Sequence, residues 1–238
     1  MKYLLTAIAF LLILPNVGSA QKADYWQGGV FVGTTAFSGD VNPNATPDLN
    51  EISFAFGLSG RVDFTNKLGF KGSLIYGNFK GDDLNYEERQ NRAFNFSTNV
   101  IEFVGIAEWE PFGADRYYTD AGGDVQMDKL ISPYLYAGAG LAFATLNTDY
   151  SGFTGLSERI NTGIRMDRAE GNSKMAFVVP MGFGIKGDVS NHITLALDFG
   201  WRLVFSDYLD GISQSGNPDN DDIYFISGLT FYYRFFNN

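Results

Sequence analysis

Bulky apolar residues alternate with small or charged residues along the segment 193–206. Its odd positions, from Ile193 to Phe205, carry only Ile, Leu, Phe and Trp, whereas its even positions carry Thr, Ala, Asp, Gly, Arg, Val and Ser. A period of two is typical of a β-strand whose two faces meet different environments. Strands of soluble proteins usually have about five or six residues, so this long alternation predicts a strand that crosses a bilayer at a tilt.

The same alternation recurs along the chain and predicts eight strands. The segments are 25–39, 52–64, 68–79, 94–110, 133–143, 175–189, 193–206 and 223–235. An even number of strands places both ends of the strand array on the same side of the membrane, which we take to be the periplasmic side.

The segment 94–110 is ambiguous, because Phe94, Phe96 and Val100 share a parity with Glu102 and Glu108. We expect the two glutamates to point into the barrel. A β-bulge near Asn99 would then let the apolar residues before it point outward.

The second face of these strands decides between a membrane barrel and a soluble β-sandwich. In a sandwich, the polar face meets water and should carry many Lys, Glu and Thr. Here that face consists mostly of Gly, Ala, Ser and Tyr, which suit a narrow, filled lumen behind an apolar exterior. The fold class that we predict is all-β: a transmembrane antiparallel β-barrel of eight strands.

Ten charged residues fall on the predicted inner face. Five are basic and five are acidic, so the set is electrically neutral and favours paired packing of the lumen over the solvated charges of a soluble sheet. The luminal charge network comprises Arg61, Asp63, Lys71, Glu102, Glu108, Lys186, Asp188, Asp198, Arg202 and Arg234.

The connections between the predicted strands are of unequal length. Two short ones, 65–67 and 189–192, lie on the periplasmic side, and four long ones lie outside, as expected of outer-membrane barrels. The long ones are 40–51, 80–93, 146–173 and 207–221. The periplasmic segment 111–131 breaks this asymmetry and is too long for a routine turn, so it is either disordered or used for contact.

The N-terminus has the features of a cleaved signal peptide. Lys2 precedes the apolar run 4–14, and Gly18 and Ala20 offer small residues for cleavage before Gln21. The alternative is a short helical anchor, but the run is too short to span a bilayer comfortably. The predicted division is a signal peptide at 1–20 and an outer-membrane β-barrel at 21–238.

Net charge and cysteine content limit the classes of partner and chemistry that the chain can have. A formal net charge of −10 would repel nucleic-acid phosphates, so we expect no nucleic-acid partner. The chain has no Cys, which excludes a disulfide framework, a thiol nucleophile and a lipidated N-terminal cysteine. We expect its partners to be outer-membrane lipid and the barrel-assembly machinery of a Gram-negative envelope.

Aromatic residues support this placement. Those at predicted periplasmic strand ends suit the headgroup region: Trp26, Phe64, Trp109, Tyr233 and Phe235. In the last strand, Gly228 is followed by Phe231, Tyr233 and Phe235 at two-residue spacing. This pattern resembles the C-terminal signal read by the barrel-assembly machinery; the alternative is an aromatic edge strand, which would be prone to aggregation.

We find no catalytic, cofactor-binding or metal-binding set and predict a protein that is not an enzyme. The only histidine, His192, lies in a predicted periplasmic turn, where we expect it to be solvated. Two acidic groups lie in the outer loops: Asp82, Asp83, Glu87 and Glu88, and then Asp219, Asp221 and Asp222. Their spacing matches no calcium loop, so we interpret them as solvated charge and assign no metal and no cofactor.

Several stretches resemble the PorG-type outer-membrane proteins of the type IX secretion system. They cover most of the mature chain in order: 37–43, 76–83, 91–96, 101–103, 132–138, 179–186 and 205–213, the last with Asp207-Tyr208-Leu209-Asp210. The resemblance implies a non-catalytic barrel that ties a periplasmic ring of proteins to the outer membrane. The segment 111–131 and the third outer loop are longer than the family pattern.

Two other functions stay open at this point. A small adhesin or envelope-stability barrel would act through the outer loops. A lipid-active enzyme would need a catalytic histidine near the outer edge, which His192 does not provide.

Overall fold

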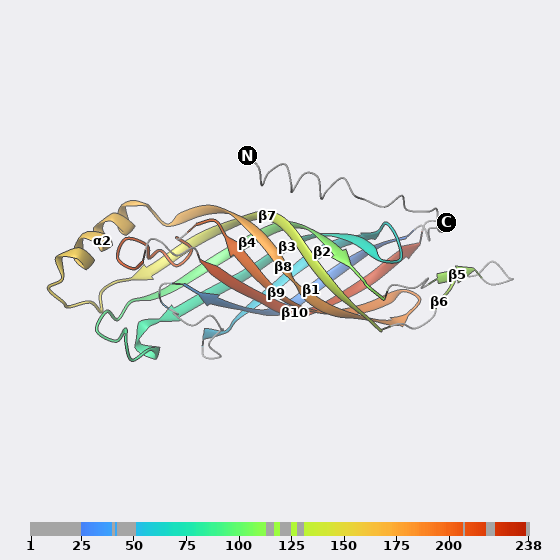
Figure 1. Ribbon diagram of the computed structural model, residues 1–238, viewed down its shortest axis with the longest axis horizontal. Coiled ribbons are helices and arrows are strands. Elements are labelled where there is room, and N and C mark those ends of the chain that lie inside the picture. Colours follow the sequence, from blue (N-terminus) through green and yellow to red (C-terminus); the bar gives the residue numbers. More distant parts are fainter. Residues whose placement is uncertain are drawn as a thin grey trace.

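Eight long strands of the described chain close into an antiparallel barrel (Figure 1). The computed structural model describes residues 25–39, 41, 51–112, 117–119, 125–127, 131–206, 208–217 and 222–236. The barrel strands are β1 (Tyr25–Ser38), β2 (Ser53–Asp63), β3 (Leu68–Asp82), β4 (Asn95–Trp109), β7 (Ile131–Asp149), β8 (Ser173–Ser190), β9 (Ile193–Val204) and β10 (Ile223–Phe236). Each strand pairs with the next, and β1 closes the barrel on β10 from Tyr25↔Phe236 to Ser38↔Ile223. The predicted fold class is confirmed, while the predicted signal peptide lies outside the described residues.

Smaller elements lie in the connections. Strands β5 (Tyr117–Thr119) and β6 (Val125–Met127) pair as a separate hairpin beyond the end at which β10 finishes (Figure 1). The 3-10 helix η2 (Asp83–Asn85) and helix α2 (Glu158–Ala169) lie at the opposite end. Across the described residues, no helix combines the length and apolar character needed to cross a membrane.

The bulge predicted near Asn99 is wrong. Pairing of β4 with β3 and β7 is unbroken from Asn95 to Trp109. Every even residue of β4 therefore points inward, and Phe96 and Val100 are buried rather than exposed to lipid. The lumen accepts them because its loop-side half is apolar. The described barrel has its register shift in β8, between Asp188 and Ser190.

Several strands continue beyond the predicted limits on the loop side. β7 runs to Asp149 instead of residue 143, and β3 runs to Asp82 instead of residue 79. The outward residues of these extensions are polar, so the apolar alternation that predicts a strand fades before the backbone pairing ends.

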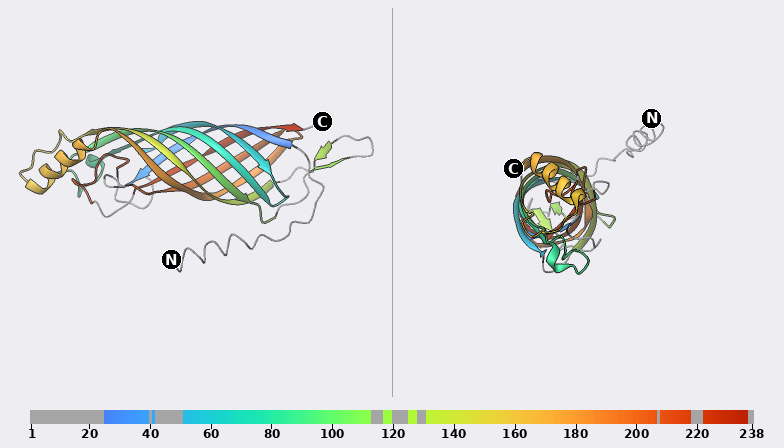
Figure 2. Two further views of the ribbon diagram at one scale, coloured as in Figure 1. Left: turned by 90° about the horizontal axis from the view of Figure 1, so that it is seen from above. Right: turned by 90° about the vertical axis from the view of Figure 1, so that its left-hand side faces the viewer.

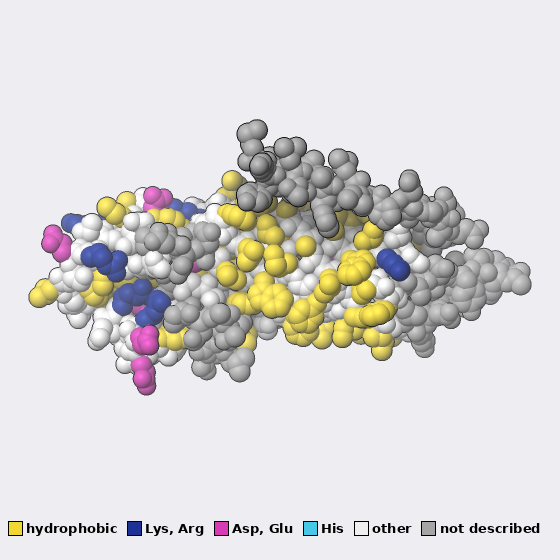
Figure 3. Space-filling view, viewed as in Figure 1, with side chains coloured by type: hydrophobic (Ala, Val, Ile, Leu, Met, Phe, Trp, Pro, Cys, Tyr) yellow, Lys and Arg dark blue, Asp and Glu magenta, His cyan; other side chains and the backbone are white. Residues whose placement is uncertain are grey.

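Large apolar side chains cover the outside of the barrel as a belt (Figure 3). On β2 and the turn after it, exposed apolar residues extend from Phe54 to Phe64. Ten residue steps correspond to about 33 Å along a strand and about 25 Å along the axis at a tilt of about 40°. This is the height of the apolar band of outer-membrane barrels. The belt therefore faces the hydrocarbon of a bilayer, and the barrel spans a membrane.

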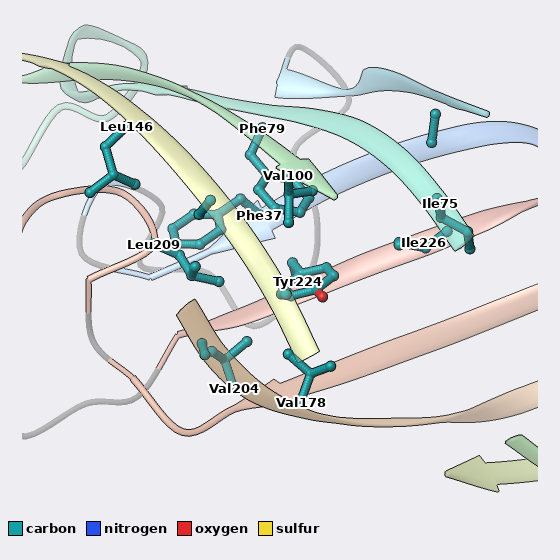
Figure 4. Packing of buried hydrophobic residues seen from close by; sticks show 14 of the residues in the cluster. Phe37, Ile75, Phe79, Val100, Leu146, Val178, Val204, Leu209, Tyr224 and Ile226 are labelled. Atoms are coloured by element: carbon teal, nitrogen blue, oxygen red, sulfur yellow. The ribbon is translucent and has the colours of Figure 1, made fainter. Parts of the chain in front are cut away.

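The barrel interior is filled in two parts. Its loop-side half holds aromatic and aliphatic side chains (Figure 4), with ring centroids 5.0 Å apart for Phe37 and Phe96 and 4.7 Å apart for Phe79 and Tyr224. The other half is ionic. Close packing requires glycine in places: a Cβ on Gly200 would overlap the hydroxyl oxygen of Tyr136.

Candidate functional site

The largest ionic group lies inside the barrel near the end at which β1 begins and β10 finishes. Arg61 binds Glu108 (Nε–Oε2 2.7 Å), Glu110 (Nη2–Oε1 2.9 Å) and Asp63 (Nη1–Oδ2 2.8 Å). Lys186 binds the same two glutamates, at 2.5 and 2.9 Å from its Nζ. Both cations are buried, so the three strands β2, β4 and β8 are joined through the lumen.

Lys71 extends this group across the barrel. Its Nζ lies 3.3 Å from Glu108 Oε1 and 3.4 Å from Asp198 Oδ1. Tyr134 also donates a hydrogen bond to Asp198. A chain of charges therefore runs from Glu108 on β4 through Lys71 on β3 to Asp198 on β9.

Two further pairs stand apart from this group. Arg202 Nε lies 3.1 Å from Glu102 Oε2, and the Tyr224 hydroxyl donates to the same oxygen at 2.5 Å. Arg234 binds Asp188 and donates to the carbonyl oxygens of the β8–β9 turn, including Ser190 O at 3.1 Å. Nine of the ten predicted luminal residues are thus buried, and Asp63, at the end of β2, is partly exposed beside Arg61. The ion pairs described above fall into three groups.

Sequence reasoning missed Glu110. It is buried, binds Arg61 and Lys186, and accepts a hydrogen bond from the Ser132 hydroxyl at 2.6 Å. Its parity matches that of Glu102 and Glu108, so continuing the same pattern by one step would have found it. With Glu110, six carboxylates face five cations, so the set is not neutral as predicted.

The lumen is sealed in the described part of the chain. The internal cavity beside Lys71, Tyr136 and Asp198 has a volume of about 20 Å³, which is room for about one water molecule. Side chains fill the interior on both sides of it. Among the residues that the structure describes, this cavity is far too small for a polypeptide to pass.

The loop between β9 and β10 closes the other mouth. Its residues Leu209 and Ile212 are fully buried and belong to the same buried apolar cluster as Phe37 and Leu146 (Figure 4). The Thr98 hydroxyl, inside the barrel, donates to the carbonyl oxygen of Leu209 at 2.7 Å. The prediction placed this loop outside as a polar connection; in the structure, its apolar residues turn inward and complete the luminal core.

Helix α2 holds this loop in place. Asp167 is buried and accepts hydrogen bonds from the backbone N–H groups of Ser213, Gln214 and Ser215, at 3.4, 2.9 and 3.0 Å, and from the Ser215 hydroxyl. Seen end-on in Figure 2, α2 lies over the rim of the barrel mouth. One carboxylate thus joins two loops that are distant in sequence.

Aromatic contacts join a third loop to this cap. The Phe94 ring lies 5.0 Å from the Tyr150 ring and 6.2 Å from the Phe153 ring. The Tyr150 hydroxyl donates to Gly211 O at 2.5 Å, and burial raises the pKa of this phenol. The loops after β3, β7 and β9 therefore form one ordered unit, which we call the loop cap (residues 83–94, 150–172 and 208–217).

The first acidic loop group is partly structural. Asp83 is fully buried and forms an ion pair with Arg92 (2.6 Å), and Asp82 accepts from the N–H of Leu84. Only Glu87 and Glu88 are exposed as predicted.

The second acidic group is also not fully solvated as predicted. Asp222 is fully buried and accepts from the N–H of Leu209 at 2.8 Å, while Asp219 and Asp221 lie outside the described residues. Within the described residues, no group of three or more acidic or His side chains could hold a metal ion.

Aromatic side chains lie on the outside of the barrel at the end where β1 begins and β10 finishes. The Trp26 and Phe235 rings stack at 4.1 Å, and the exposed His192 stacks on Tyr233 at 5.6 Å. The predicted assembly-signal residues Phe231, Tyr233 and Phe235 all lie on the outer face of β10, and Gly228 lies against Gly33 of β1.

Comparisons with known proteins place this arrangement in a family. The family model described as "Domain of unknown function (DUF6089)" matches residues 2–238. The chain belongs to this family. No curated protein matches the chain in sequence.

Solved outer-membrane proteins are similar to the chain at low identity. Ail of Yersinia pestis, in complex with the heparin analogue sucrose octasulfate, is 13% identical, with 89% of this chain and 98% of that chain covered and a TM-score of 0.46. Neisserial surface protein A is 12% identical, with 89% and 97% covered and a TM-score of 0.46. A major outer membrane protein of Thermus thermophilus is 13% identical, with 88% and 99% covered and a TM-score of 0.44. With its apolar belt, closed sheet and filled lumen, this chain is an outer-membrane-type β-barrel.

Proposed function

We propose that this chain is a non-catalytic structural barrel of the type IX secretion machinery that ties a periplasmic ring to the outer membrane. The sealed lumen is the observation that supports this most. The described luminal cavity beside Lys71 has room for about one water molecule, which argues against a role as the conduit and for a function of the parts that project from the membrane.

The connection between β4 and β7 is the part suited to a periplasmic partner. It leaves the barrel at the end where β10 finishes, and it carries the separate hairpin of β5 and β6 (Figure 1). A short hairpin outside the main sheet presents unpaired edges to a partner. The resemblance of the chain to PorG-type proteins supports the same partner, a ring of periplasmic secretion proteins.

Deleting residues 114–128 tests this proposal. We expect the barrel to keep its heat-modifiable migration on gels while its co-purification with the periplasmic ring is lost. A control variant replaces the exposed Glu87 and Glu88 of the loop cap with Gly and Ser and should co-purify normally. Undiminished co-purification of the deletion variant would contradict the proposal.

The ordered loop cap supports a second candidate, an adhesin or envelope-stability barrel. A rigid surface loses little conformational entropy when it binds a partner, and the cap exposes Leu84 and Leu156. Replacing residues 151–170 should then abolish surface binding while secretion continues. If secretion is lost instead, this candidate is refuted. For either function we expect a deletion strain to keep its lipid A profile, and an altered profile would point to a lipid-active enzyme.

A further inference from the structure

A hollow lies on the outer wall of the barrel, where β3, β4, β7 and β8 lie side by side. Its volume is about 420 Å³, in the range of sites that hold small molecules. The side chains that line it include Ile101, Phe143 and Met175, which are 47%, 46% and 65% exposed. The hollow therefore opens outward from the barrel and is continuous with the apolar belt.

Strand register divides the lining into two rows. The lower row is apolar: Tyr76 pairs with Ile101, Ile101 with Phe143, and Phe143 with Met175. The upper row lies two residues closer to the loop cap and is polar. In it, Asn99 pairs with Thr145, and Thr145 pairs with Ser173. The hollow thus straddles the line at which the belt ends.

Several polar groups of the upper row are available for hydrogen bonds with a ligand. Within the described residues, the hydroxyls of Thr145 and Ser173 form no side-chain hydrogen bond, and the Asn99 carbonyl oxygen accepts from Tyr76 and Asn78 while its NH₂ group has no acceptor. Lys174 at the rim is already neutralised, because its Nζ lies 2.9 Å from Glu170 Oε2. The free groups are neutral donors and acceptors in a row.

We propose that this hollow seats one lipid molecule of the leaflet on the loop side. Its acyl chain lies along Ile101, Phe143 and Met175, and its headgroup forms hydrogen bonds with Asn99, Thr145 and Ser173. The position dictates the occupant: the apolar row lies within the belt, where water is excluded and lipid fills a hollow in the wall, and the polar row lies directly above it, at the depth of a headgroup. Recognition by neutral groups means that the headgroup charge contributes little.

This inference rests only on the barrel spanning a membrane, not on a role in secretion. It is tested on the isolated barrel, so its failure would leave the proposed function untouched. The probe is a vesicle of phosphatidylethanolamine and phosphatidylglycerol. The protein is reconstituted, extracted in detergent and weighed by native mass spectrometry to count retained lipids.

We expect the wild-type barrel to retain one lipid, of either headgroup. Thr145→Phe fills the hollow and should lower the singly bound fraction about tenfold, whereas Thr145→Val, which removes only the hydroxyl, should lower it less. Thr34→Phe is the matched control, because Thr34 is exposed on β1, four strands from β7 in both directions around the barrel. That control should retain lipid as the wild type does.

Heat-modifiable migration shows whether each variant folds. If Thr145→Phe fails to fold, Ser173→Phe fills the hollow from the neighbouring strand and should give the same loss. A broad distribution of lipid numbers in the wild type would overturn the proposal. Equal retention by the two variants, Thr145→Phe and Thr34→Phe, would also overturn it.

Discussion

The buried pair Glu102–Arg202 gives a quantitative test of how the lumen is stabilised. Both side chains are buried, at 0% and 3% exposed, and the pair stands apart from the larger ionic group. Glu102→Gln leaves the guanidinium without a counter-charge, and Arg202→Met leaves the carboxylate with only the Tyr224 hydroxyl. Each single variant should lose about 3–5 kcal/mol of unfolding free energy, because an uncompensated charge stays buried.

The double variant should lose far less than the sum of the two. Removing both charges removes both desolvation costs, and replacing a whole buried pair is often neutral, so we expect a change within about 2 kcal/mol of the wild type. The coupling free energy is then at least about 4 kcal/mol. Urea unfolding in detergent micelles, followed by tryptophan fluorescence, measures it.

A surface pair provides the control for this cycle. Lys174 and Glu170 lie 2.9 Å apart, but the Glu170 side chain is 54% exposed. The same double-mutant cycle there should give a coupling below about 1 kcal/mol, because water screens the charges. Additive losses at Glu102 and Arg202, or equal coupling at both pairs, would refute the assignment of a buried lumen.

The packing of the loop cap and the lumen leads to three further predictions. Asp167→Ala removes the carboxylate that accepts hydrogen bonds from the loop after β9. It should lower the opening free energy of residues 208–217, measured by hydrogen exchange, by about 1–3 kcal/mol, whereas Glu158→Ala on the same helix should leave it unchanged. Gly200→Ala drives a Cβ into Tyr136 and should destabilise the barrel by about 1–3 kcal/mol in urea unfolding, and adding Tyr136→Phe should recover part of this loss; no recovery would contradict the contact. In planar bilayers the wild-type barrel should show no steady ion conductance, and stable open channels would contradict the sealed lumen.

The outer face of the barrel could be predicted from the sequence almost entirely. Strand geometry forces a period of two, and lipid demands apolar residues at every outward position, so the pattern is dense and local. The same parity places Glu102 and Glu108 inside. The predicted bulge near Asn99 is not needed, because bulky apolar residues such as Phe96 can point into the lumen.

The partners within the lumen could not be predicted in the same way. Lys71 and Asp198 are 127 residues apart, and which charges meet across the lumen depends on the stagger of the strands. The loop cap escaped prediction for a different reason. Leu209 and Ile212 lie in a short polar segment without periodicity, and their burial follows from the shape of the barrel mouth and from the contact with Asp167.

Lipid exposure along β9 is the most direct test of the orientation of the strands. The chain has no Cys, so single cysteines at Leu195, Leu197, Phe199 and Ala196 can each carry a fluorophore in vesicles that contain brominated lipid. We expect strong quenching at the three odd positions and weak quenching at Ala196. Equal quenching at all four, or a folded protein that stays soluble without detergent, would contradict this orientation.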